Sequence, residues 1–287
     1  MLEIKDPQGL QKVRLRSASM LSSVGRLVGL SQTQLVVCGF PRGGTSLLYN
    51  MLSASLPHFR FESFEKYFIH RIHKLGNIGT KAPLDALHLP HIDKLNINNK
   101  KLIILIVVRD IRDVITSIHP IYNKEYFIGY DYSWWPQDKA MEEWKYDAPG
   151  VIPIHNAIQE VCNRPDTMIV RYEDLVDNPN KEQEKIKARF ELSFDQEFSD
   201  YHYNSEKHAY RYQGRQAPSD SSLVRESSKV TRSRVSRWSN TDDSVLRVIS
   251  QFSQCEALFD VLMSYGYERN RRWFEKLSSG SGKRGLL

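Results

Sequence analysis

The chain has 287 residues, of which 40% are hydrophobic and 26% charged, and its formal net charge is +6. This composition is globular and excludes a disordered, collagen-like or coiled-coil chain. The longest apolar run has seven residues, 102–108, whereas a membrane-spanning helix needs about 20. Three cysteines without metal-ligand spacing, and an N-terminus without a secretory signal pattern, favour a cytoplasmic protein without disulfides or structural zinc.

Composition divides the chain into three regions. Residues 1–33 are basic and weakly patterned, which predicts an N-terminal arm that packs on the body or, alternatively, contacts a membrane surface. Residues 34–277 alternate between strand and helix patterns and form the predicted domain. Residues 278–287 (SSGSGKRGLL) are rich in Gly and Ser and predict a flexible tail.

The strand and helix patterns predict an α/β fold. Continuous apolar runs at 34–39 and 102–108 are typical of strands that are covered on both faces. Shorter strands are expected at 77–81 and 167–171. Helices are expected at 45–55, 110–118, 153–162, 181–190 and 242–265. Alternation of this kind predicts three layers around a mainly parallel sheet, with ligands at the carboxyl ends of the strands.

The segment 39–46 (GFPRGGTS) follows the first buried strand and opens a helix. Glycines and free N–H groups at a helix start favour binding of a phosphate group. Gly39 and Gly44 have the spacing of a nucleotide-triphosphatase P-loop, but Thr45 stands where that loop has lysine. The cation is instead Arg42. The second apolar strand ends at Arg109 without an acidic Mg²⁺ ligand, so we expect phosphate binding without a metal ion.

Three further motifs follow in order: RDIRDVITS (109–117), VRYEDL (170–175) and RSRVSRW (232–238). Together with PRGGTS they resemble the sulfotransferases that use 3′-phosphoadenosine 5′-phosphosulfate (PAPS), over roughly residues 34–268. The arginine in PRGGTS is more similar to the tyrosylprotein and bacterial glycan branches than to the cytosolic small-molecule branch. The resemblance implies a P-loop nucleotide-triphosphatase-like topology and sulfuryl transfer from PAPS to a hydroxyl group, with 3′,5′-ADP as product and no metal.

The resemblance also implies the role of individual residues. Alternatives remain for some of them, because Arg109 or Arg112 could simply pair with Asp110 or Asp113 on the helix surface, and Tyr172 and Trp238 could be core aromatics. The implied contacts are Arg42, Gly43, Gly44, Thr45 and Ser46 to the 5′-phosphosulfate, Arg109, Ser117 and Arg232 to the 3′-phosphate, Tyr172 near the adenine, and Ser236, Arg237 and Trp238 over the cofactor.

Sulfuryl transfer, like phosphoryl transfer, depends on positioning and electrostatics. Lys81, in the segment GTKAP, resembles the lysine that the family places near the transferred group. An acceptor hydroxyl also needs a general base. Glu62 is the predicted base, with Glu65 and then His88 as alternatives.

The acceptor is predicted from aromatic residues. Residues 119–150 hold nine of the 31 aromatic side chains, which favours a carbohydrate or glycolipid acceptor, although a packed aromatic insertion is the alternative. A P-loop kinase-like phosphotransferase and a non-catalytic nucleotide-binding module are the rival functions. Nucleic acid is not an expected partner, because the cations lie in loops after strands rather than along one helix.

Overall fold

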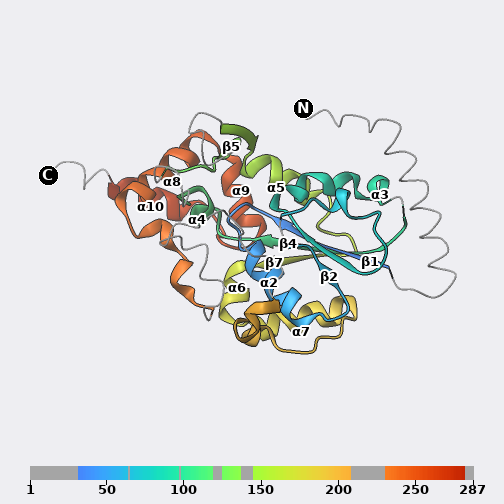
Figure 1. Ribbon diagram of the computed structural model, residues 1–287. Coiled ribbons are helices and arrows are strands. Elements are labelled where there is room, and N and C mark those ends of the chain that lie inside the picture. The colour runs from blue at the N-terminus through green and yellow to red at the C-terminus, as the bar shows by residue number, and fades with distance from the viewer. Residues whose placement is uncertain are drawn as a thin grey trace.

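The structure is a computed structural model that describes residues 32–63, 65–96, 98–118, 125–136, 145–207 and 230–281. Its centre is a parallel sheet in the order β2-β3-β1-β4-β7 (Figure 1). The strands are β1 (Thr33–Gly39), β2 (Arg60–Phe61), β3 (Ile78–Lys81), β4 (Lys101–Val108) and β7 (Thr167–Arg171). Because all five are parallel, their carboxyl ends meet at one edge of the sheet.

Helices cover both faces of this sheet. Alternate residues of β1 and β4 point to opposite faces, so Val36 and Ile104 lie in one core while Leu35 and Ile103 lie in the other. One face is covered by α2 (Thr45–Ser55), α6 (Tyr172–Asp177), α7 (Pro179–Phe190) and η3 (Phe198–Lys207). The other is covered by η2 (Pro83–His91), α3 (Ile92–Leu95), α4 (Ile111–Ile115), α5 (Val151–Gln159), α8 (Asp242–Gln254), α9 (Ala257–Ser264) and α10 (Arg272–Ser281). The predicted three-layer α/β fold is confirmed.

Two predicted helices are wrong in extent. The helix expected at 242–265 is two helices, because Cys255 adopts an extended backbone between α8 and α9. Its apolar spacing continues from Phe252 to Leu258 and Leu262, all buried, so the pattern does not show the break. The helix expected at 110–118 ends at Ile115, and Ser117 follows it.

A two-stranded antiparallel sheet was not expected. It consists of β5 (Tyr132–Pro136) and β6 (Lys145–Pro149), within the aromatic segment 119–150. The predicted arm falls almost entirely outside the described residues. At the other end, α10 continues to Ser281 and includes the first four residues of the predicted tail. In the part of the chain that the structure describes, no helix is long and apolar enough to cross a membrane.

Candidate nucleotide and sulfuryl-transfer site

The loop between β1 and α2 is closely packed against its neighbours. Gly39 has φ 136°, and a Cβ there would lie 2.0 Å from the carbonyl oxygen of Val107. Gly44 has φ 99°, and its Cβ would lie 2.3 Å from a ring carbon of Tyr172. Arg42 also adopts a left-handed backbone, with φ 61°. The loop conformation therefore depends on glycine at two positions, where a side chain would collide with β4 or with Tyr172.

The start of α2 is suited to an anion. The first N–H groups of any α-helix, here including those of Thr45 and Ser46, have no carbonyl partner within the helix. Gly44 offers no side-chain cap, and the first turn of α2 has no acidic residue. Positive helix-end charge and the nearby Arg42 thus fit a phosphate or sulfate group.

Arg109, at the tip of β4, joins three segments of this site. Its guanidinium donates from Nη1 to the carbonyl of Arg42 at 3.2 Å and from Nη2 to Asp113 Oδ2 at 3.1 Å. It also donates to the carbonyl of Arg234 and lies 4.6 Å from the ring centroid of Tyr172. Its Nε is buried and has no acceptor among the described residues. Arg109 therefore holds the site together and keeps one donor unused.

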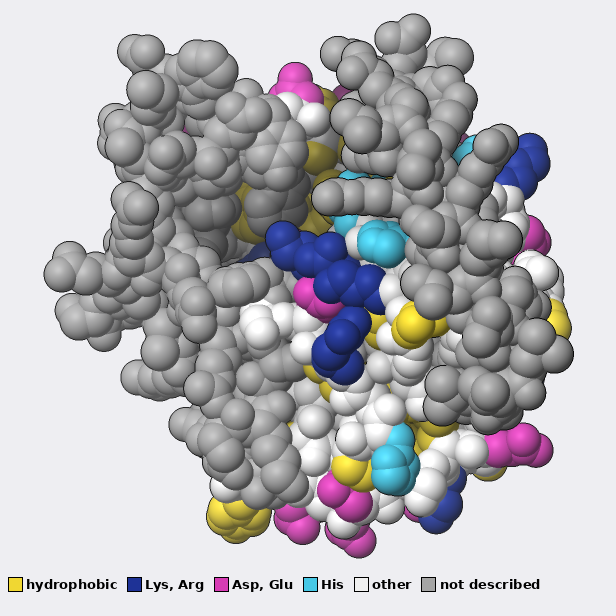
Figure 2. All heavy atoms as spheres, turned by 45° about the vertical axis from the view of Figure 1, so that its right-hand side comes forward, with side chains coloured by type: hydrophobic (Ala, Val, Ile, Leu, Met, Phe, Trp, Pro, Cys, Tyr) yellow, Lys and Arg dark blue, Asp and Glu magenta, His cyan; other side chains and the backbone are white. Residues whose placement is uncertain are grey.

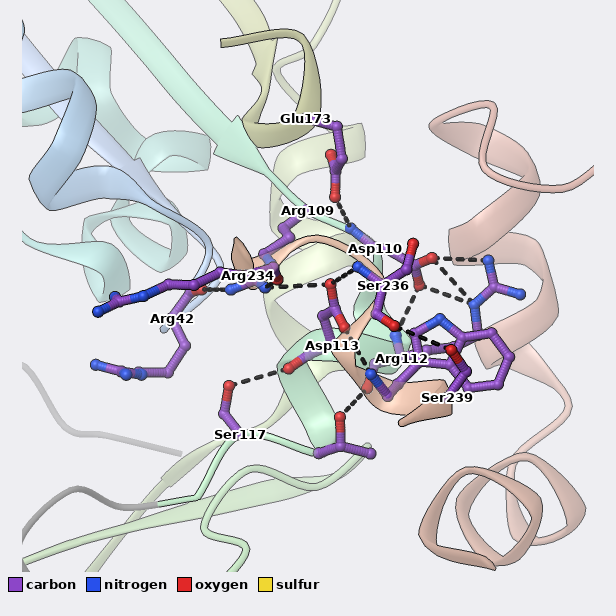
Figure 3. A network of polar contacts seen from close by, with 12 residues as sticks. Arg42, Arg109, Asp110, Arg112, Asp113, Ser117, Glu173, Arg234, Ser236 and Ser239 are labelled. Atoms are coloured by element: carbon purple, nitrogen blue, oxygen red, sulfur yellow. Dashed lines mark hydrogen bonds and ion pairs between the residues drawn. The ribbon is translucent and has the colours of Figure 1, made fainter. Parts of the chain in front are cut away.

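Asp113 anchors the basic loop that precedes α8 (Figure 3). Its carboxylate accepts the backbone N–H of Ser236 at 2.9 Å and that of Trp238 at 3.0 Å, in addition to the Arg109 contact. The side chain is almost fully buried. Sequence reasoning considered Asp113 only as a surface ion-pair partner and missed this role. The i,i+4 spacing from Arg109 was the available signal.

Trp238 packs against the guanidinium of Arg112. The Arg112 guanidinium lies 4.6 Å from the ring centroids of both Trp238 and Trp273. It pairs with Asp110 at 2.7 Å and with Glu268 at 2.7 Å. Burial alone would lower the pKa of Arg112, but hydrogen bonds to these carboxylates raise it above the usual value. The cation stays charged and ties the basic loop to the C-terminal helices.

The predicted 3′-phosphate residues are only partly brought together. The hydroxyl of Ser117 donates to the carbonyl of Asp113 at 3.0 Å, so it lies beside the Arg109 network. Arg232 instead pairs with Asp177 at 3.0 Å and is 67% exposed. Figure 3 shows Arg234, which sequence reasoning missed, extending toward Arg42. The two arginines are two positions apart in a loop without periodicity, so the sequence does not tell which one faces the site.

Three more predicted cofactor residues can be placed. The ring of Tyr172 is buried between Gly44 and Arg109, and so it supports the loop. Arg237 is exposed, and Ser236 has φ 59° where its N–H meets Asp113. Ser236 therefore joins the basic loop to Asp113, and Arg237 adds no further buried cation.

Lys81 and Glu65 form an ion pair at the carboxyl end of β3. Lys81 is 1% exposed and pairs in register with Val37, two residues before Gly39. Burial lowers the pKa of Lys81, the Glu65 carboxylate opposes this, and Arg42 adds to the lowering. Lys81, Glu65 and Arg42 are therefore close enough to interact electrostatically.

Glu62 has different partners. Its Oε1 lies 2.8 Å from Arg71 Nε and 3.2 Å from Lys74 Nζ. Burial raises the pKa of Glu62, but hydrogen bonds from the two cations outweigh it and hold the pKa below its usual value. The side chain of Glu62 is 16% exposed, whereas that of Glu65 is 51% exposed. Of the two predicted acids, the structure brings Glu65 to Lys81 and Glu62 to a separate cation pair.

His88, the third predicted base, lies beside a buried carboxylate. Its Nδ1 is 3.5 Å from Asp85 Oδ1, and its ring centroid is 5.4 Å from that of Tyr67. Asp85 Oδ2 accepts the N–H of Phe68 at 3.0 Å. Burial raises the pKa of Asp85 to about 6, against the opposing effect of His88 and this N–H.

Figure 2 shows a cluster of Lys and Arg side chains near the centre of this face, with an acidic side chain and a histidine next to it. No group of three or more His, Cys, Asp or Glu side chains that could hold a metal ion is found within the described ranges.

The comparisons identify the class of protein that this fold and site define. A sulfotransferase domain family matches residues 32–254, and the chain belongs to that family. The resemblance seen in the motifs is thereby confirmed. Among curated proteins, none matches the chain in sequence.

Two solved structures are similar in fold. The mouse sulfotransferase SULT7A1 complexed with PAP is 14% identical, with 93% of this chain and 95% of that chain covered and a TM-score of 0.45. A sulfotransferase domain from the curacin biosynthetic pathway is 13% identical, with 78% of this chain and 98% of that chain covered and a TM-score of 0.36.

Proposed function

We propose that this protein transfers the sulfuryl group of PAPS to a hydroxyl group of a carbohydrate or glycolipid. The observation that carries the proposal is the joining of two anion-binding regions at one sheet edge. Arg109 connects the uncapped start of α2, through the Arg42 carbonyl, with the basic loop at Arg234. A nucleotide with phosphates at both its 5′ and 3′ positions matches two such regions, and the family membership supports the same conclusion.

The 5′ end of the cofactor belongs at the start of α2. There the N–H groups of Gly44, Thr45 and Ser46 and the Arg42 guanidinium would hold the phosphosulfate, whereas the N–H of Gly43 donates to the carbonyl of Phe40 at 2.9 Å. PAPS, when bound, supplies the sulfuryl group and the 3′,5′-ADP leaving group. These donors would stabilise the negative charge that develops on the departing phosphate. Arg109 Nε, Ser117 and Arg234 would contact the 3′-phosphate, with Arg237 and Trp238 over the nucleotide.

Glu65 is the general base that the contacts favour. It shares a charge pair with Lys81, which lies at the carboxyl end of β3 in register with Val37, just before the loop that would hold the phosphosulfate. Glu65 would take the proton of the acceptor hydroxyl as the oxygen attacks sulfur. Glu62 is less suited to this role, because its carboxylate is held by Arg71 and Lys74 rather than by Lys81.

The acceptor class rests on the aromatic hairpin. Tyr132 of β5 is 56% exposed, and Trp134 and Trp135 lie in the same strand. Aromatic rings of this kind commonly pack on sugar rings. Trp144 lies outside the described residues. We place the enzyme in the cytoplasm, where the free Cys38, Cys162 and Cys255 would stay reduced. We keep residues 34–277 as the catalytic domain and 1–33 as an arm.

The test is an acceptor screen with ³⁵S-labelled PAPS and a pool of neutral and acidic glycans. Labelled product that persists in EDTA is the expected result. Transfer of phosphate from labelled ATP that requires Mg²⁺ would instead support the kinase alternative. Tight binding of 3′,5′-ADP without transfer to any acceptor would support a non-catalytic module.

A further inference from the structure

The segment from β2 to the end of β3 carries an excess of positive charge next to Glu65 and Lys81. Residues 60–81 contain five Lys and Arg side chains and two glutamates, an excess of three in a chain whose formal net charge is +6. Both glutamates are already paired, Glu62 with Arg71 and Lys74, and Glu65 with Lys81. The remaining positive charge has no acidic counterpart in this segment.

Three of these cations and two histidines form a basic strip, which we define as Lys66, His70, Arg71, His73 and Lys74. The strip starts at the transfer site, since the N–H of Lys66 donates to the carbonyl of Lys81 at 3.1 Å. It then follows η1 (Phe68–His70) and the turn in which Lys74 N–H donates to the carbonyl of Arg71 at 2.9 Å.

The side chains of the strip are accessible and interact with one another. Arg71 and Lys74 are 21% and 35% exposed, and His70 is exposed. Burial lowers the pKa of His70, and Arg71, Lys66 and His88 lower it further. The pKa of His73 is lowered by burial and then by Lys74, Arg71, Lys100 and His70. Repulsion among neighbouring cations is relieved when an anion binds between them.

The acidic groups beside the strip neutralise it only in part, because the single carboxylate of Glu62 is shared by Arg71 and Lys74. From η2, His88 is 34% exposed and Asp85 is fully buried. In α3, Asp93 is paired with Arg164 at 2.7 Å. Lys100, before β4, donates to the carbonyl of Gly76 at 3.2 Å and adds a further cation.

We infer that the acceptor is an acidic saccharide, whose carboxylate or sulfate groups lie on the basic strip while one hydroxyl faces Glu65. This inference rests on the proposed function and narrows its acceptor class. An acidic saccharide carries both hydroxyl and anionic groups at regular intervals along its chain. Its anionic groups can therefore contact the strip while one of its hydroxyl groups lies at the transfer site. Tyr67, whose ring lies edge-on to both His70 and His88, adds the aromatic surface that favours a sugar over an acidic peptide.

The test compares three probes for binding to the full chain saturated with 3′,5′-ADP. They are a hyaluronan hexasaccharide, the same hexasaccharide with its carboxylates reduced to alcohols, and a glutamate-rich peptide with one tyrosine. The hyaluronan hexasaccharide should bind at least about tenfold more tightly than the reduced one, the size of one charge-assisted contact. The preference should weaken as salt rises, and the NMR-measured pKa values of His70 and His73 should increase on binding.

The double variant His70→Gln/Lys74→Gln should lose this preference, whereas Lys187→Gln on α7, an exposed lysine in an ion pair, should keep it. Equal affinity for the two hexasaccharides, a preference that survives in the double variant, or tighter binding of the peptide would overturn the inference. Failure of the proposed function has a separate signature, namely that 3′,5′-ADP binds no better than 5′-AMP and no acceptor receives ³⁵S.

Discussion

The two sides of the sheet edge, to which we assign the nucleotide and the acceptor, are built differently. On the nucleotide side, Arg109 and Asp113 bind backbone groups of the neighbouring loops, so that side chains fix the main chain before any ligand arrives. On the acceptor side, the predicted acids pair with the side chains of cations, as in Lys81–Glu65 and Arg71–Glu62.

This difference indicates that the two sides perform different tasks, nucleotide binding on one side and reaction with the acceptor on the other. A network that holds backbone N–H groups in place suits a ligand that never changes, such as the nucleotide of PAPS. The Glu65 carboxylate is 51% exposed although its partner Lys81 is buried, and an exposed carboxylate suits a site that exchanges a proton and admits a bulky acceptor. Substitutions on the two sides should therefore affect different steps.

The largest effect is expected from Glu65→Gln. The amide oxygen can still accept from Lys81, but the general base is lost, so turnover should fall about 10²–10⁴-fold. Affinity for 3′,5′-ADP should stay within about twofold, since a carboxylate attracts no anion. Steady-state kinetics with ³⁵S-PAPS and calorimetry with 3′,5′-ADP check the two parts.

Glu62→Gln is the matched control, three residues away with the same change. It should keep most of the turnover, because Glu62 pairs with Arg71 and Lys74 rather than with Lys81. If Glu62→Gln is inactive while Glu65→Gln is active, Glu62 is the base, as first predicted from sequence. If both are active and His88→Ala is not, the base is His88.

The next largest loss of turnover is expected from Arg42→Ala. Removing one charged group that stabilises the leaving phosphate costs about 10²–10³ in turnover, and binding of 3′,5′-ADP should weaken in the same variant. Arg232→Ala is the control, because Arg232 faces Asp177. A loss in Arg232→Ala as large as in Arg42→Ala would show that the basic loop changes its arrangement when the nucleotide binds.

Asp113→Asn should mainly weaken nucleotide binding. One amide oxygen can replace one carboxylate oxygen, but the Nδ2 group then meets a second donor, the N–H of Ser236 or Trp238. Losing a charge-assisted hydrogen bond costs about 1.5–3 kcal/mol, so the Kd for 3′,5′-ADP should rise roughly tenfold or more. Calorimetry should show no such change for Asp93→Asn, an exposed carboxylate that pairs with Arg164. Equal Kd values for Asp113→Asn and the wild type would mean that Asp113 does not position the loop.

Much of the framework followed from sequence, because its signals are local. The apolar runs of β1 and β4 and the glycines of the first loop lie within a few residues of each other. The family resemblance carried the residue roles that periodicity alone could not.

The remaining features depend on contacts between distant residues. Three contacts decide these features: Glu65 with Lys81, Asp113 with the N–H of Ser236, and Arg109 with the carbonyl of Arg234. They join positions between 16 and 125 residues apart. In irregular loops no repeat tells which side chain faces inward. Thus the sequence predicted which segments build the site, and the structure was needed to tell which acid and which arginine lie within it.

The smallest effect concerns the structural role of Glu62. Its pKa is lowered in the folded state because the hydrogen bonds from Arg71 and Lys74 outweigh the effect of burial. The ionised form therefore stabilises the fold at pH values above the unfolded-state pKa of about 4.3, and this contribution is lost as the pH falls through the lower folded-state pKa. Since Arg71 and Lys74 are partly exposed, we expect only about 0.5–1 kcal/mol at pH 7. Glu62→Gln should lower the free energy of unfolding in urea by that amount at pH 7, and the difference from wild type should shrink as the pH falls below about 4.3. Glu184→Gln, in an exposed helical pair with Lys187, should change stability less at either pH. An unchanged free energy of unfolding in Glu62→Gln at pH 7 would show that the ion pairs with Arg71 and Lys74 do not stabilise the fold. It would contradict a structural role for Glu62 and favour a role as the general base.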